Sequence, residues 1–177
     1  MPASQPAFKP ASAEQGFTLV ELMVTIAVLA IIASIAVPSM RSLIAANRIS
    51  ATATELVTGV QLARSEATRR NAQVTLCPSV DGQACANQTD WSRWIVTGRD
   101  NSSGEVEVLR AFSVPAGMQV DGPVGGIRFR ASGMPAAPAS LTVCLPVERP
   151  ADNQRVISLL AGGGVSTEKH NGAGACP

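Results

Sequence analysis

A long apolar segment near the beginning of the chain is the strongest pattern in the sequence. From Leu19 to Val37 the only charged residue is Glu21, and the only polar ones are Thr25 and Ser34. A helix of this length matches the roughly 30 Å hydrocarbon core of a bilayer, where backbone polar groups must bond within the segment. The pattern predicts a membrane-spanning helix. It argues against a core helix of a soluble protein, because no comparable apolar partner helix follows.

A cleaved secretory signal peptide is the other interpretation of this segment. Such a peptide combines a positive leading region, an apolar centre and a small-residue cleavage site. Here the leading region is long and nearly neutral, with Lys9 and Glu14 as its only charged residues. Ala33, Ser34 and Ala36 mimic a small-residue site. The membrane helix remains the favoured interpretation.

Helical periodicity continues beyond Pro38, a residue that we expect to kink the helix or interrupt its hydrogen bonds. The stretch from Ser39 to Asn71 contains no proline, and its apolar residues recur at intervals of three, four or seven. The apolar positions are Leu43, Ile49, Leu56, Val57, Val60, Ala63 and Ala67. One helix from Phe17 to Asn71 would be roughly 80 Å long at about 1.5 Å per residue.

The remainder of the chain has the pattern of β-strands. Short runs rich in β-branched residues alternate with Gly, Pro, Asn and Asp. The predicted strands are Val74–Cys77, Trp94–Thr97, Val106–Phe112, Ile127–Ala131, Leu141–Leu145 and Arg155–Leu160. The sequence therefore predicts an α+β protein with one long N-terminal helix.

Composition narrows the functional classes. Charged residues make up 15% of the chain, against roughly 25% in a typical soluble domain. The formal net charge is +1, which excludes a globally basic nucleic-acid-binding protein and a strongly acidic protein. The 46% of hydrophobic residues excludes a disordered chain.

The reactive residues do not form a catalytic pattern. The single histidine, His170, lies in a polar stretch that we interpret as a solvated tail. The run Gly162–Gly164 opens no helix and lacks a following Lys-Ser/Thr, so it is interpreted as a turn or flexible backbone rather than a phosphate loop. No serine lies in a nucleophile-elbow motif. We therefore expect no enzymatic activity, cofactor, metal or small-molecule ligand.

Two motifs resemble a known superfamily. The segment from Gly16 to Pro38, with Gly16-Phe17-Thr18-Leu19-Val20-Glu21 at its start, resembles the N-terminus of type IV pilins and type II secretion pseudopilins. The stretch from Leu56 to Asn71, which includes LARSEATRRN, resembles the signature of the GspH/FimT branch of minor pilins and minor pseudopilins. Together with the strand layout, the resemblance covers most of the chain.

The resemblance implies a domain organisation. It implies a leader at 1–16, a membrane-spanning helix at 17–38, the periplasmic half of the helix at 39–72 and a β-rich domain at 73–177. The fold would be pilin-like, with the long helix packed on a small antiparallel sheet domain. The chain would be a single-pass inner-membrane protein with a periplasmic domain, and part of a pilus or pseudopilus after assembly.

The resemblance also implies roles for individual residues. A prepilin peptidase would cut between Gly16 and Phe17, and the new amino group of Phe17 would be methylated. Glu21 occupies the position of the family's single intramembrane acid, and Pro38 that of its helix-kinking proline. Because a carboxylate inside a membrane is expensive without a partner, the Phe17 amine of a neighbouring subunit is the counter-ion that we expect for Glu21.

Other major and minor pilins or pseudopilins, the peptidase and inner-membrane lipid would then be the partners of the chain. Its work would be to enter a filament and help to initiate its assembly. The sequence alone does not separate a type IV pilus from a secretion pseudopilus, because both use the same signal and helix. Features shared with the FimT branch favour the pilus slightly.

Four cysteines and a periplasmic location together predict disulfides. None are spaced as zinc or CxxC redox ligands, and four cysteines allow three pairings. We favour Cys77–Cys85, which closes a local turn-rich loop, and Cys144–Cys176, which ties down the end of the chain.

A DNA receptor for natural transformation is the alternative function. The Gly-Arg-x-Arg motif of DNA-binding relatives has no match, since the nearest stretch is Gly163-Gly164-Val165-Ser166. A substitute patch would have to use Arg128 and Arg130, which alternate on one strand, together with Lys169. With no tyrosine for base stacking and no excess of basic residues, DNA is a possible partner that we do not favour.

Overall fold

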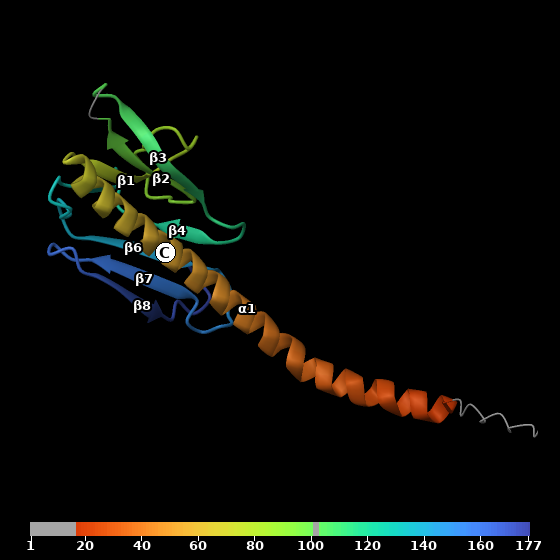
Figure 1. Cartoon of the computed structure of the whole chain (residues 1–177). Helices are drawn as coiled ribbons and strands as arrows, with labels where there is room; N and C mark the ends of the chain where they lie inside the picture. Colours follow the sequence, from red (N-terminus) through yellow and green to blue (C-terminus); the bar gives the residue numbers. More distant parts are fainter. Residues whose placement is uncertain (1–16, 101–102) are drawn as a thin grey trace, which may run out of the picture. The chain divides into compact units, whose positions relative to one another are not determined.

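The computed structural model describes residues 17–100 and 103–177. In this part of the chain one helix, α1 (Leu19–Arg70), is followed by eight strands (Figure 1). The strands are β1 (Val74–Pro78), β2 (Arg93–Arg99), β3 (Val106–Ser113), β4 (Gln119–Asp121), β5 (Ile127–Phe129), β6 (Ala139–Cys144), β7 (Gln154–Leu159) and β8 (Val165–His170). The chain divides into two compact units, one that ends at Ser39 and one that begins at Met40.

Local residues determine where α1 begins and ends. Thr18 is the N-terminal cap, since its Oγ1 accepts a hydrogen bond from the backbone N–H of Glu21 at 3.2 Å. At the other end Asn71 has a φ of 48°, a left-handed conformation that asparagine tolerates. The N–H groups of Asn71 and Ala72 reach back to the carbonyls of Thr68 and Ala67, both at 3.2 Å, and so close the last turn. The helix is thus slightly shorter than the predicted Phe17–Asn71, and it continues through Pro38.

The strands form two four-stranded antiparallel sheets. The first has the order β3-β2-β1-β5 and the second the order β4-β6-β7-β8. The central strand β2 is buried along almost its whole length, whereas β3 and β8, at the outer edges, are largely exposed. The predicted sheet domain therefore consists of two sheets rather than one.

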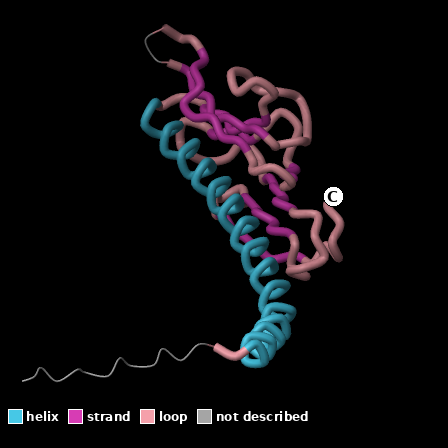
Figure 2. Tube along the Cα trace, turned by 90° about the vertical axis from the view of Figure 1, so that its right-hand side faces the viewer, coloured by secondary structure: helices cyan, strands magenta, loops and turns pink. Residues whose placement is uncertain are grey.

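The part of α1 from Met40 to Arg70, called here the domain part of α1, lies against the strands of both sheets (Figures 1 and 2). Its buried residues recur at helical spacing and line one face. They are Ala45, Ile49, Thr52, Ala53, Leu56, Gly59, Val60, Ala63 and Ala67. This face joins residues of both sheets, such as Trp94 on β2 and Ile157 on β7, in one hydrophobic core.

Small residues on α1 let the first sheet approach the helix closely. A Cβ atom added to Gly59 would lie 2.5 Å from Trp94 Cζ3 and 2.6 Å from its Cη2. Trp94 is 1% exposed, and its ring stacks on Phe112 of β3 with centroids 3.8 Å apart. The indole is therefore held between the helix backbone and a second aromatic ring.

The structure shows all six predicted strands and adds two that the pattern did not predict. β4 has only three residues, and β8 is a polar sequence, Val-Ser-Thr-Glu-Lys-His, with no apolar alternation. The interpretation of His170 as part of a solvated tail is therefore wrong in one respect: its side chain is exposed, but its backbone pairs with Gln154 of β7. The glycines of 162–164 form the turn of the β7–β8 hairpin, where Leu160 N–H donates to Gly164 O at 2.9 Å.

Both disulfides favoured from the sequence are present. The loop disulfide, Cys77–Cys85, and the tail disulfide, Cys144–Cys176, have Cα–Cα distances of 5.5 and 5.7 Å. The tail is also held by polar contacts with β7 and the loop before it. Asn153 Nδ2 and Gln154 Nε2 donate to the carbonyl of Ala175 at 3.1 and 2.9 Å. The end of the chain is therefore part of the folded domain.

Candidate assembly surface

The apolar segment of α1, Leu19–Val37, presents its side chains outward. No residue of its most hydrophobic stretch is buried within the chain. The large apolar side chains of the segment, such as Leu29 and Ile35, are 46–74% exposed. By length and composition this helix can cross a membrane. An apolar surface of this extent requires lipid or other apolar helices around it.

Polar groups within the apolar segment are satisfied inside the helix. The hydroxyls of Thr25 and Ser34 donate to the carbonyls of Leu22 and Ile31 at 2.8 and 2.7 Å, as the absence of water in a bilayer demands. The carboxylate of Glu21 differs, because it has no ion pair with any of the described residues. Glu21 is therefore the one group in this segment that needs a partner from another molecule.

The predicted cleavage site lies at the edge of the described residues. Phe17 is 82% exposed, and Gly16, like the whole leader at 1–16, lies outside the described residues. Pro38 lies within α1, one residue before the end of the first compact unit.

Ion pairs join the C-terminal turn of α1 to the first sheet. Arg69 Nη2 and Arg70 Nε lie 2.6 and 2.9 Å from Glu66 Oε2, and Arg70 also pairs with Glu107 of β3. The hydrogen bonds from Arg69 and Arg70 lower the pKa of Glu66 to about 2. Glu66 is thus paired at i+3 and i+4 with arginines, and it makes no ion pair with Arg64, whose Nη1 instead donates to Gly163 O at 3.2 Å. These contacts give Arg64 and Glu66 a structural role in the domain.

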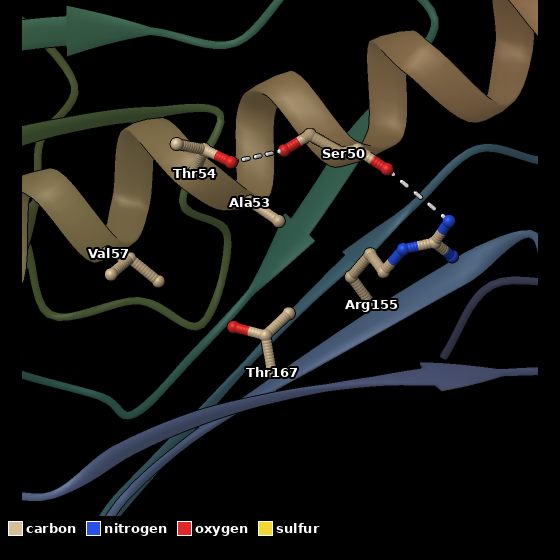
Figure 3. A pocket seen from close by; sticks show the side chains of 6 residues that line it. All are labelled: Ser50, Ala53, Thr54, Val57, Arg155 and Thr167. Carbon is tan, nitrogen blue, oxygen red and sulfur yellow. Dashed lines mark hydrogen bonds between the residues drawn. The ribbon is translucent and has the colours of Figure 1, made fainter.

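A second feature lies between the domain part of α1 and the β7–β8 hairpin. Here a cavity of about 260 Å³, which we call the Arg155 pocket, opens to the surface (Figure 3). It is lined by Ser50, Ala53, Thr54, Val57, Arg155 and Thr167. Arg155 is 6% exposed, although arginine is almost never buried without a partner.

Sequence reasoning did not single out Arg155, although a signal was present. Arg155, Ile157 and Leu159 alternate along β7, so the arginine occupies the apolar register of its strand. A charged residue at a core position of a predicted strand is a mark of a partnered or functional group.

The residues suggested for DNA contact are not gathered on one sheet. Arg128 is on β5 of the first sheet, opposite Thr75, and Arg130 follows that strand. Lys169 is on β8 of the second sheet, opposite Arg155. The structure thus provides no single strand or sheet on which these three cations form a patch.

Comparison with known proteins identifies the family. The sequence matches the family described as Type II transport protein GspH over residues 52–163, more than half of the chain. The chain belongs to the GspH family. Residues 11–37 also match the prokaryotic N-terminal methylation motif. A comparison with curated protein sequences gave no match.

Solved structures share the fold of this GspH-family chain. The type IV minor pilin FimU of Pseudomonas aeruginosa has a TM-score of 0.54 at 23% identity, over 69% of this chain and 89% of that one. The minor pseudopilin EpsH from the type 2 secretion system of Vibrio cholerae has a TM-score of 0.52 at 15% identity, over 69% and 97%. These likenesses confirm the predicted pilin-like fold.

The chain is thus a member of a family of minor pilins and pseudopilins of type IV pili or type II secretion, as its motifs indicated. Such proteins are structural subunits that assemble with other pilins, and the apolar N-terminal helix fits anchoring in the inner membrane. Nothing in the comparisons supports the DNA-receptor alternative.

Proposed function

We propose that this chain is a minor subunit that enters a type IV pilus or type II secretion pseudopilus through the apolar segment of α1 and helps to initiate its assembly. The exposure of that segment, with a single unpaired carboxylate at Glu21, carries the proposal. In the membrane, lipid covers the segment. In a filament the same surface packs against the helices of neighbouring subunits.

Maturation prepares the segment for assembly. A prepilin peptidase removes the leader after Gly16, and the resulting N-terminus is the amine of Phe17, which is then methylated. Positive charge is thereby created four residues before Glu21, at the beginning of the helix. The β-rich domain lies in the periplasm, where its two disulfides persist.

Pairing between subunits gives Glu21 its role. The carboxylate of one subunit binds the Phe17 amine of the next, because an unpaired ion in an apolar environment is costly. This contact sets the stagger of neighbouring helices, while the surface of the β-rich domain selects the partners.

Filament incorporation of Glu21→Ala and Glu21→Val tests this proposal. Each variant replaces the chromosomal copy, and its amount in sheared filaments, or in cross-linked pseudopili, is divided by its amount in the membrane. We expect unchanged membrane insertion and folding, with incorporation reduced roughly tenfold or more, as when one partner of a buried charge pair is lost.

Ser34→Ala is the matched control, since Ser34 lies in the same segment and bonds only within its own helix. It should incorporate like the parent. Incorporation of Glu21→Ala at the level of Ser34→Ala would overturn the role of Glu21. Intact-mass measurement of the membrane-extracted chain, with and without the peptidase, tests maturation, because a mature chain must begin at N-methylated Phe17.

A further inference from the structure

We propose that the Arg155 pocket binds a carboxylate of a neighbouring filament subunit, and so forms a second, polar docking point on the β-rich domain. This inference rests on the proposed function, because it requires that the chain meets other subunits. The site lies within the unit that begins at Met40 and uses none of the apolar segment.

The unmet charge of Arg155 is the first argument. Its guanidinium bonds only neutral acceptors among the described residues: Nη1 donates to the carbonyls of Asp152 and Gln154 at 3.0 and 2.8 Å, and Nη2 to Ser50 Oγ at 3.4 Å. None of the ion pairs formed by the described residues includes it. A buried cation without an anion is destabilising, and a carboxylate removes that penalty.

The geometry of the free donors is the second argument. Both carbonyl bonds use Nη1, so Nε has no acceptor in the described part of the chain, and Nη2 has only the long contact of 3.4 Å with Ser50 Oγ. Nε and Nη2 form one edge of the planar guanidinium, the edge that binds a carboxylate through two parallel hydrogen bonds, so an entering carboxylate would replace only the contact with Ser50. Figure 3 shows this edge turned toward Ser50 and Ala53, across the pocket.

The surroundings of the pocket favour an anion with an apolar stem. Lys169 lies opposite Arg155 on β8, and Ile157 of β7 pairs with Thr167, so Lys169 and Thr167 share the face of Arg155. Arg155 and the hydroxyls of Ser50 and Thr167 therefore line the pocket, while Ala53 and Val57 form its apolar wall. Lys169 adds a second positive charge on the same face of the sheet. An aspartate or glutamate side chain fits this lining, because its carboxylate can bind the polar groups and its methylene groups can contact the apolar wall.

The position of the pocket favours a carboxylate carried by a protein. β8 is the outer strand of its sheet, and its second backbone edge has no partner strand among the described residues. An exposed edge of this kind is open to pairing with a segment of another chain. A neighbouring subunit that approaches this edge brings its side chains to the mouth of the pocket.

Substitution of Thr167 by an acid provides the first test. In Thr167→Glu the new carboxylate lies on the pocket face, diagonal to Arg155 and within reach of a long side chain. It occupies the guanidinium from within the same chain. We expect the thermal unfolding midpoint of the full chain in detergent to rise, and its incorporation into filaments to fall at least tenfold.

Two variants serve as matched controls. Ser166→Glu adds the same charge on the opposite face of β8, so it should leave incorporation unchanged. Thr167→Gln has the size of glutamate without its charge, and we expect its incorporation to remain well above that of Thr167→Glu. Equal incorporation of Thr167→Glu and Ser166→Glu would overturn the proposal, as would equal loss in Thr167→Glu and Thr167→Gln.

Arg155→Lys gives a second, independent test, with Arg128→Lys on the first sheet as its control. Lysine keeps the positive charge but cannot form the two parallel bonds, so incorporation should fall at least threefold for Arg155→Lys alone. A loss of incorporation that matches the loss of thermal stability across the variants would show a purely structural role for Arg155 and refute the docking site.

Identification of the partner completes the design. A photo-crosslinking amino acid at position 167 should form a bond to another filament subunit, close to an acidic residue of that subunit. Substitution of that acidic residue by lysine should reduce incorporation into filaments, and Arg155→Glu should restore it. If the parent chain enters filaments and these variants behave like their controls, the docking site fails and the proposed function stands. If the parent chain never enters filaments, the proposed function fails, and this inference fails with it.

Discussion

The contact between Gly59 and Trp94 makes Gly59→Ala the most informative single substitution in the fold. At an ordinary helix position this change stabilises a protein by about 0.5–1 kcal/mol, because alanine has the higher helix propensity. Here the added Cβ would lie 2.5 and 2.6 Å from two ring carbons of Trp94, whereas carbon atoms pack favourably at roughly 3.5–4.0 Å. We therefore expect the sign of the effect to be reversed.

The magnitude follows from how little the indole can move. Trp94 is 1% exposed and stacked on Phe112, so it cannot retreat without displacing a second ring. Overpacking of a filled core costs typically about 1–3 kcal/mol. After subtraction of the propensity gain of about 0.5–1 kcal/mol, the centres of the two ranges leave a net loss of about 1 kcal/mol in the free energy of unfolding.

Urea unfolding of the full chain in detergent, followed by tryptophan fluorescence and circular dichroism, measures this loss. Thr58→Ala is the control, because its neighbouring position is exposed and carries the propensity gain without a clash. A thermal midpoint lower by roughly 4 °C per kcal/mol should accompany the change in Gly59→Ala. Equal or greater stability of Gly59→Ala relative to the parent would refute the close packing of α1 on β2.

Three further predictions concern stability. Because the pKa of Glu66 is lowered from 4.5 to about 2, its contribution to stability is fully present above pH 4.5 and is lost as the pH falls through 2. Glu66→Gln should cost about 1 kcal/mol at pH 7, a small value because its partner Arg69 is exposed, and urea titrations should show that the difference from the parent vanishes below pH 2. Removal of the tail disulfide should cost about 1 kcal/mol more than removal of the loop disulfide, since it closes a longer loop; equal unfolding midpoints for the two double Cys→Ser variants would contradict this. Gly126→Ala should be more destabilising than Gly104→Ala in thermal unfolding, because both glycines have positive φ but only the former faces the Leu76 carbonyl and the Cys77 backbone.

The family and the general architecture could be predicted from local patterns. The apolar segment, the glycine before Phe17 and the acid at Glu21 form a contiguous signal, because a membrane helix and a processing site are read along the chain. The six apolar strands were also predictable, since period-two alternation marks a half-buried strand. The capping of α1 by Thr18 and Asn71 depends on residues next to the helix ends.

Packing between distant segments determined the features that the hydrophobic pattern of the sequence did not predict. β8 carries no apolar alternation and exists because β7 offers a free edge after the glycine turn at 162–164. The burial of Arg155 beneath α1 is visible only in the structure, because its contact on the helix, Ser50, is distant in the sequence. Likewise Gly59 is an unremarkable helix residue until Trp94 is placed against it.

The sequence by itself therefore determined the long apolar helix, the N-terminal methylation motif and the identity of the family, since each depends on residues that are neighbours in the chain. Only the tertiary structure decided the division into two sheets, the β7–β8 hairpin and the Arg155 pocket. The physical reason is that these features depend on contacts between distant segments. Their energies come from burial and pairing that no single stretch of residues encodes.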